Sequence, residues 1–341
     1  MTIYDISKMA GVSIATVSRV LNGNANVRPE TRKKVLDVME RCGYTPNAFA
    51  RGLGLNSMNT IGILCADSSD LYLAKAVYHI EQNLRLGGYR SLLCCTGYEL
   101  ENKKNSLGLL LNQKVDGVIM VGSNFIEEDD ADNQYIRDAA QQVPVMLLNA
   151  DFDYPNVYCT LCDDFKAAQE ATLSLIDAGI ADILYLYNSR SYSGKNKLAG
   201  YQSAFLQKDL PLSREYQQYY AGSHEDVDGI CHFLDGLRRS GFSFHAVFAS
   251  EDILATAAVK YARLNDLRIP EELSIIGYNN SILASCCEPE LTSVDNRLED
   301  ICRQLVKTLI MTLGGNQMPQ KTIFSGRLIR RGTTAPLNHE L

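Results

Sequence analysis

The amino-acid sequence predicts a multi-domain protein: an all-α helix-turn-helix head and a hinge helix, followed by an α/β core of two doubly wound lobes with parallel sheets. Three observations support this prediction. Residues 2–22 have the pattern of two short helices joined by a turn, and residues 47–58 form a short segment that contains glycine. From residue 60 onward, apolar runs alternate with amphipathic segments, and this series runs twice. We therefore expect three parts, which are residues 1–46, residues 47–58 and residues 59–341.

Local capping signals indicate the first two helices. Thr2 followed three residues later by Asp5 is a capping-box pattern, which places the start of the first helix at Ile3. Gly11 can adopt the left-handed backbone conformation that a tight turn requires. Ser13 is a good N-cap for the second helix. The two helices and their turn therefore have the layout of a helix-turn-helix, whose second helix enters a DNA major groove.

The second helix carries the candidate base-contacting face. Its apolar residues Val17, Val20 and Leu21 lie at helical spacing and are expected to face inward. Small, hydroxyl-bearing and basic side chains then lie on the outer face, where Arg19 can donate two hydrogen bonds to a guanine. An ordinary solvated surface is the alternative interpretation. The candidate DNA contacts of the head are Thr2, Tyr4, Ser13, Ile14, Ala15, Thr16, Ser18, Arg19 and Asn22.

Two further helices are expected before residue 58. Pro29 stands in the first turn of a third helix, and Gly43 ends it. Pro46 begins a fourth helix, in which Gly52 and Gly54 each cost about 1 kcal/mol relative to alanine. A helix this short and this weak is not stable alone in water. It therefore needs a partner to fold against.

Residues 1–58 resemble the DNA-binding head of the LacI/GalR repressor family. The resemblance rests on the runs 6–13, 15–23, 27–32 and 43–53, which occur in the family's order. It implies that a homodimer places two heads in successive major grooves of a pseudo-palindromic operator in double-stranded DNA. It also implies that the fourth helix is a hinge that folds on DNA, where Asn47, Ala50 and Leu53 contact the duplex and Leu53 enters the minor groove. The alternative for Leu53 is a core position in a docked linker.

The distribution of charge supports the division into head and core. Residues 1–60 contain eight lysines and arginines and four acidic residues, whereas the rest of the chain contains 25 and 36. The net charge is therefore +4 for the first part and −11 for the second. A basic head on an acidic core suits phosphate contact by the head alone.

Composition indicates a cytoplasmic protein. The chain has no apolar run that could span a membrane, and its N-terminus lacks the basic, apolar and small-residue regions of a signal peptide. We therefore expect no membrane partner, and the ten cysteines to be thiols in a reducing compartment. Cys159 and Cys162 have a redox or zinc spacing, but no second pair or histidine cluster accompanies them. We expect inert packing thiols, no metal site and no cofactor.

The residues after 60 predict two α/β lobes. Continuous apolar strands that alternate with amphipathic helices indicate parallel sheets covered on both faces. The series breaks near residues 156–163, which predicts an N-lobe of residues 59–158 and 291–323 and a C-lobe of residues 159–290 and 324–341. The expected strands are 61–65, 91–95, 117–121, 145–148, 157–161, 183–187, 246–249 and 274–278, and the expected helices are 73–87, 103–113, 164–178, 227–240 and 252–266.

The core resembles the ligand-binding core of the same family, which is similar to periplasmic sugar-binding proteins. The runs 87–89, 115–119, 198–201, 247–255 and 268–278 carry the resemblance. By position it implies an effector site between the lobes, formed by Asp67, Tyr72, Asp163, Lys197, Glu251, Asp252 and Asn279. Lys197 replaces the family's usual arginine and lacks its planar fork, and Glu251 and Asn279 also depart from the family's pattern. We therefore expect a small polar metabolite, such as a sugar or sugar derivative, without assuming a typical sugar.

The sequence lacks the catalytic motifs that would indicate an enzyme. It has no Gly-x-x-x-x-Gly-Lys-Ser/Thr phosphate loop, no Gly-x-Ser-x-Gly elbow and no His-Glu-x-x-His motif. We predict a sequence-specific transcriptional regulator, a repressor, whose operator affinity is controlled by the effector. Two alternatives stay open: a cytoplasmic ligand-binding module without DNA function, and a sugar-related α/β enzyme.

Overall fold

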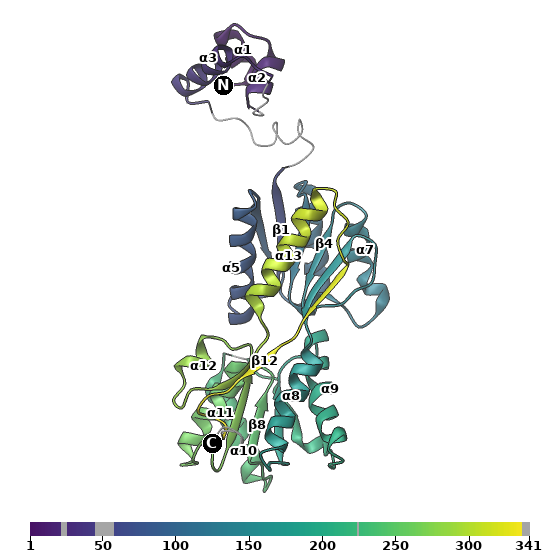
Figure 1. Ribbon diagram of the computed structural model, residues 1–341, viewed down its shortest axis with the longest axis vertical. Coiled ribbons are helices and arrows are strands. Elements are labelled where there is room, and N and C mark those ends of the chain that lie inside the picture. The colour runs from purple at the N-terminus through teal and green to yellow at the C-terminus, as the bar shows by residue number, and fades with distance from the viewer. Residues whose placement is uncertain (22–25, 45–57, 224, 336–341) are drawn as a thin grey trace.

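The computed structural model of the chain describes residues 1–21, 26–44, 58–223 and 225–335 (Figure 1). Several predicted DNA contacts lie outside these ranges, namely Asn22, Asn47, Ala50 and Leu53. The predicted hinge helix lies outside them as well.

The head consists of three short helices around a small apolar core. They are α1 (Ile3–Ala10), α2 (Ile14–Leu21) and α3 (Pro29–Arg41). Thr2 and Asp5 form the predicted capping box, and Gly11 ends α1 in the left-handed conformation with φ of 62°. The start of α1, the glycine turn and the place of Pro29 in the first turn of α3 are therefore confirmed. The buried apolar residues of this core are Ile6, Ala10, Val17, Val20, Val27, Val35, Val38 and Met39.

The N-lobe is a parallel sheet between two pairs of helices. Its strands are β1 (Thr60–Cys65), β2 (Arg90–Cys95), β3 (Gly117–Val121), β4 (Val145–Leu148), β5 (Val157–Cys162) and β11 (Lys321–Phe324), in the order β11-β5-β4-β3-β1-β2. Apolar residues of α5 (Leu71–Leu86) and α13 (Leu298–Leu313) pack on one face of the sheet. Those of α6 (Leu100–Asn112) and α7 (Gln134–Ala140) pack on the other.

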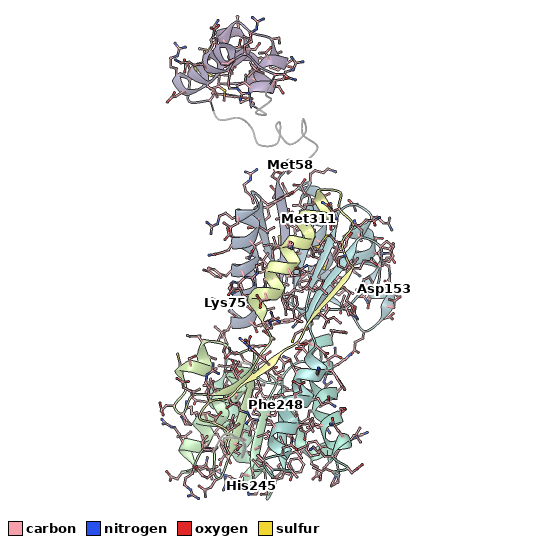
Figure 2. All side chains as sticks on the ribbon, in the orientation of Figure 1. Met58, Lys75, Asp153, His245, Phe248 and Met311 are labelled. Atoms are coloured by element: carbon pink, nitrogen blue, oxygen red, sulfur yellow. The ribbon has the colours of Figure 1, made fainter. Side chains whose placement is uncertain are left out.

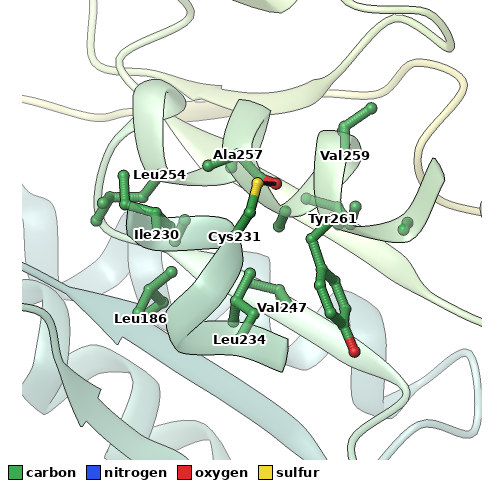
Figure 3. Packing of buried hydrophobic residues seen from close by; sticks show 14 of the residues in the cluster. Leu186, Ile230, Cys231, Leu234, Val247, Leu254, Ala257, Val259 and Tyr261 are labelled. Atoms are coloured by element: carbon green, nitrogen blue, oxygen red, sulfur yellow. Dashed lines mark hydrogen bonds between the residues drawn. The ribbon is translucent and has the colours of Figure 1, made fainter. Parts of the chain in front are cut away.

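The C-lobe repeats this architecture. Its strands are β6 (Ile183–Tyr187), β7 (Gln217–Tyr219), β8 (Ala246–Ala249), β9 (Ser274–Tyr278), β10 (Thr292–Asp295) and β12 (Arg327–Ile329), in the order β12-β10-β9-β8-β6-β7. Helices α8 (Asp164–Ile176) and α9 (Tyr192–Gln207) cover one face. Helices α10 (Val227–Arg239), α11 (Asp252–Leu264) and α12 (Ile282–Cys286) pack on the other, where Ile230, Leu234 and Leu254 belong to one buried apolar cluster (Figure 3). β12 is antiparallel to β10.

The carboxyl ends of both parallel sheets face each other. Met58, just before β1, lies at the end of the N-lobe remote from the C-lobe (Figure 2). His245, just before β8, lies at the opposite extreme of the molecule, and Phe248 within β8 lies nearer to the N-lobe. Since ligands of open α/β sheets bind beyond the carboxyl ends of the strands, this arrangement places both binding edges around one interlobe space.

The predicted fold class is confirmed, but the lobe boundaries at 158/159 and 290/291 are wrong. The first falls inside β5, which pairs with β4 and β11 in the N-lobe sheet. The second precedes β10, which pairs with β9 in the C-lobe sheet. The third predicted boundary, at 323/324, falls within β11. The apolar run of β5 was predicted as a strand, but such a run does not show which sheet the strand joins. β10 and β11 were not among the expected strands.

Candidate functional site

The outer face of α2 is the candidate DNA-contacting surface. Ile14, Ala15 and Arg19 are exposed, with Ile14 at 40% of its full exposure, and Thr16 and Ser18 are half-exposed. The hydroxyl of Ser13 accepts a hydrogen bond from the backbone N–H of Thr16 at 3.1 Å, which confirms it as the N-cap. The predicted outer residues that the structure describes therefore lie on one accessible side of a short helix.

The first turn of α1 provides two further predicted contacts. Tyr4 is exposed. The hydroxyl of Thr2 is committed to Asp5, to whose carboxylate it donates at 2.9 Å. Hydrogen bonds from the backbone and side chain of Thr2 hold the pKa of that carboxyl below its ordinary value. The Thr2 side chain therefore caps α1, so Tyr4 is the more available of the two for a contact with DNA.

A cavity of about 660 Å³ lies between the lobes and is lined by both. Four of the predicted effector residues line it, namely Tyr72, Lys197, Glu251 and Asn279. Tyr72 comes from the start of α5, Lys197 from α9, Glu251 from the residue before α11 and Asn279 from the residue after β9. These positions follow the carboxyl ends of four strands, where the fold is expected to bind ligands.

A buried polar network begins at Lys197, which lines the cavity, and continues behind it. Lys197 retains 7% exposure, and its Nζ donates to the carbonyl of Ser250 at 3.1 Å and lies 3.9 Å from the centre of the Tyr278 ring. Tyr278 donates to Asp164 at 2.7 Å, and Ser193 donates to the other carboxylate oxygen. Burial raises the pKa of the Asp164 carboxyl, and the charge of Lys197 opposes this rise. The ammonium and the carboxylate thus lie in one desolvated cluster beside the cavity.

Three predicted effector residues do not line this cavity. Asp67 accepts hydrogen bonds from the backbone and hydroxyl of Ser69, and Asp163 caps α8 by accepting from the N–H of Lys166. Asp252 accepts from the hydroxyl of Ser293 and the N–H of Ser281, both at 2.6 Å. A ligand contact by these three side chains stays a prediction, and the bonds seen here are structural.

Several lining residues were missed by the sequence interpretation. Asn149 donates to the Tyr72 hydroxyl at 3.1 Å and accepts from the N–H of Cys162. Arg190 lies 4.6 Å from the centre of the Tyr219 ring. Lys103 enters from α6. The polar run 188–191 after an apolar strand was the available signal for Arg190, but nothing local marks Lys103, which reaches the cavity through the tertiary fold.

Comparison with known proteins places the chain in a family. The family model described as "Bacterial regulatory proteins, lacI family" matches residues 2–47, and the "Periplasmic binding protein-like domain" matches residues 172–334. The chain is 53% identical over 334 residues to an HTH-type transcriptional regulator of Lachnoclostridium phytofermentans, covering 98% of this chain and 99% of the relative. It is 30% identical to the HTH-type transcriptional regulator DegA of Bacillus subtilis, covering 99% of both. The chain belongs to the lacI family.

Solved structures of lacI-family proteins share the fold. The lac repressor dimer bound to operator and the anti-inducer ONPF has a TM-score of 0.84 at 22% identity, covering 98% of this chain and 99% of that one. The complex of the transcriptional regulator CelR with cellobiose has a TM-score of 0.70 at 25% identity, with the same coverage. This lacI-family chain is therefore a DNA-binding transcriptional regulator with a periplasmic-binding-protein-like core. Its relatives are named as regulators, a class that generally has no catalytic activity.

The described ranges contain neither a helix that could span a membrane nor a metal-binding cluster. No helix in this part of the chain combines the length and apolar character needed to cross a membrane. Within the same ranges, histidine, cysteine and acidic side chains do not gather into a group that could hold a metal ion. Cys159 and Cys162 are both buried thiols, and burial raises the pKa of Cys159 to about 11.

Proposed function

We propose that this chain is a repressor that binds a pseudo-palindromic operator as a homodimer in the cytoplasm and is switched by a small polar effector between its lobes. The observation that carries the proposal is the accessible outer face of α2 on a compact three-helix head. With Val17 and Val20 buried, the side chains left outside are of the kinds that read base edges. The hinge contacts of Asn47, Ala50 and Leu53 belong to the same proposal.

The cavity supports a polar effector of the size of a sugar. Tyrosine, lysine, asparagine and serine side chains line its 660 Å³, which suits a ligand with several hydroxyl groups. A homologous regulator, CelR, forms a complex with cellobiose. If effector binding changes operator affinity, the operator must change effector affinity by the same factor, an expected coupling of about 1–3 kcal/mol.

A thermal-shift screen tests the effector. Cellobiose, glucose 6-phosphate, gluconate and adenine represent sugars, sugar phosphates, sugar acids and nucleobases. A true ligand present at 100 times its dissociation constant stabilises the folded state by about 2.7 kcal/mol, which raises Tm. Lys197→Met should abolish that rise, because it removes the buried ammonium on the cavity wall. A rise that Lys197→Met leaves intact would place the ligand elsewhere.

Arg19→Met should relax base preference at one position of each operator half-site. A bidentate contact between arginine and guanine discriminates against other bases by about 1–3 kcal/mol, roughly a 5- to 150-fold preference. Lys33→Met is the matched control, because Lys33 is an exposed cation on α3 that we expect to contact phosphate alone. Its affinity should fall equally on all sequences, with a shallower dependence on salt. Sequence selection on the two variants measures both outcomes, and an unchanged preference in Arg19→Met would contradict the proposed docking.

The homodimer has a candidate surface on the core. Leu71 and Tyr78 of α5 and Ile282 of α12 are large apolar side chains that are at least half exposed, and all three line one groove. An exposed apolar patch of this kind commonly marks a protein interface. A lacI-family structure, the lac repressor, is a dimer. Sedimentation equilibrium should give twice the chain mass for the wild type and a shift towards monomer for Tyr78→Asp combined with Ile282→Asp.

A further inference from the structure

The two lobes touch each other directly beside the cavity. On the N-lobe, the contact comes from the segment after β3, which includes the short 3-10 helix η1 (Ser123–Phe125). On the C-lobe, it comes from the first turn of α9. The hydroxyls of Ser123 and Ser191 are 2.8 Å apart, and Glu128 forms an ion pair with Lys195 at 2.5 Å. Ser191 and Lys195 lie four residues apart, so both contacts engage the same turn of one helix.

The N-lobe side of this contact is held firmly in place. Lys103 has a side chain only 3% exposed, and its Nζ donates to the carbonyl of Asn124 and to the Glu127 carboxylate, each at 2.6 Å. The Asn133 side chain accepts from the N–H of Glu127 at 2.8 Å and donates to its carbonyl at 3.1 Å. These bonds hold the segment to α6. Ser123 and Glu128 therefore move with the N-lobe, and a contact made by either residue joins the whole N-lobe to its partner.

The C-lobe side of the contact is part of the cavity wall. The Ser191 oxygen lies 2.8 Å from the Ser123 hydroxyl and 2.9 Å from the Ser189 hydroxyl. As the N-cap of α9, it also accepts from the N–H of Gly194 at 3.4 Å. All three serines line the cavity. The Ser191 oxygen accepts in all three contacts, so its two lone pairs are already shared among these donors. The interlobe contact therefore uses the same atoms that face the cavity.

We propose that Ser123–Ser191 and Glu128–Lys195 form an interlobe latch that sets the separation of the lobes. The latch joins the N-lobe segment held by Lys103 to the first turn of α9 in the C-lobe, so breaking it removes a side-chain contact between the two lobes. Its regulatory role rests on the proposed effector site. The latch itself is tested without DNA or ligand, so its failure is distinguishable from failure of the proposed function.

Cysteine cross-linking tests the hydroxyl contact. The double variant Ser123→Cys/Ser191→Cys, oxidised with copper phenanthroline in the full chain, should yield a 123–191 linked peptide by mass spectrometry that dithiothreitol removes. Native thiols are present, two of them exposed at Cys95 and Cys286, so each single variant serves as the control for background pairing. Absence of the linked peptide from the oxidised double variant, with a circular dichroism spectrum matching the wild type, would overturn the contact.

Charge reversal tests the ion pair with less risk to folding, because both side chains are largely exposed. Glu128→Lys and Lys195→Glu should each accelerate amide hydrogen exchange in peptides 122–128 and 191–197 by about 1.5- to 5-fold, the range expected for an exposed ion pair. The double reversal should restore the wild-type rate. Unchanged exchange in the single variants, or no restoration in the double, would overturn the latch.

The matched control is an ion pair within one lobe. Lys208, just after α9, pairs with Asp177, just after α8, at 2.6 Å, and both belong to the C-lobe. Reversal of this pair by Asp177→Lys and Lys208→Glu should leave exchange in peptides 122–128 at the wild-type rate. Faster exchange there in this control would show that the effect reflects general destabilisation, and would overturn the inference drawn from Glu128 and Lys195.

Discussion

Gly200→Ala is expected to lower the free energy of unfolding by about 2–3 kcal/mol, because α8 and α9 pack too closely to admit a methyl group there. A Cβ at position 200 would lie 2.2 Å from the backbone carbonyl oxygen of Phe165 and 3.0 Å from the backbone nitrogen of Gln169. Backbone atoms of a packed helix cannot move aside cheaply, so the helices must separate. Urea denaturation measures the loss.

Gly236→Ala is the control and should have the opposite sign. Gly236 lies within α10, is exposed, and has nothing within 4 Å of its added Cβ. Alanine in an exposed helix is preferred to glycine by up to about 1 kcal/mol, so this variant should be more stable than the wild type. Equal effects of the two substitutions would contradict the close packing of α8 on α9.

Asp252→Ala should lower the free energy of unfolding by about 2–3 kcal/mol, because it leaves buried hydrogen-bond donors without an acceptor. Asp252 is 2% exposed, and its carboxylate joins the start of α11 to the Ser293 hydroxyl in β10 and to the N–H of Ser281 before α12. Asp228→Ala is the matched control, since that carboxylate pairs with Lys260 in solvent and its loss should change stability little. Comparable losses in both variants, measured by urea denaturation, would contradict the structural role of Asp252.

The contribution of Asp252 to the free energy of unfolding should also depend on pH, in a direction that its pKa determines. Burial raises its pKa above the ordinary value of 3.8, so the folded protein holds this proton more tightly than the unfolded chain does. The resulting contribution is complete below the unfolded pKa and is lost as pH rises through the raised folded pKa. The free energy of unfolding of the wild type, relative to that of Asp252→Asn, should therefore be larger near pH 4 than near pH 7. The reverse trend would show that the folded carboxyl has a lowered pKa.

Most of the helix predictions in the head rest on interactions between residues that are close in the sequence. Thr2, Gly11 and Ser13 act through neighbours within a few residues, and the structure shows each of them capping or turning a helix as expected. Apolar runs located β1 to β6, β8 and β9, but β7, β10, β11 and β12 were not predicted. The predicted boundaries split β5 between the lobes and placed β10 in the N-lobe, because sheet membership depends on pairing with segments far along the chain, such as β11 with β5.

The candidate site was only partly accessible to sequence interpretation. Tyr72, Lys197, Glu251 and Asn279 follow strand ends or begin helices, so their positions could be inferred from the resemblance. Asp252 follows Glu251 directly, yet its carboxylate turns to Ser293 and Ser281. Neighbouring residues at the start of a helix point in different directions, and only the tertiary structure shows which one faces the cavity. The latch contact at Ser123 has no sequence signal at all.

Selection from a random pool of double-stranded oligonucleotides tests the central claim, that the three-helix head reads a DNA groove. The purified full chain should enrich a pseudo-palindrome at low ionic strength, and its affinity should fall as salt rises, because phosphate contacts release counterions. Half-site centres about 10 base pairs apart, or a multiple of that, would match two heads in successive major grooves. Failure to enrich any sequence at low ionic strength, with and without a metabolite extract, would contradict the account.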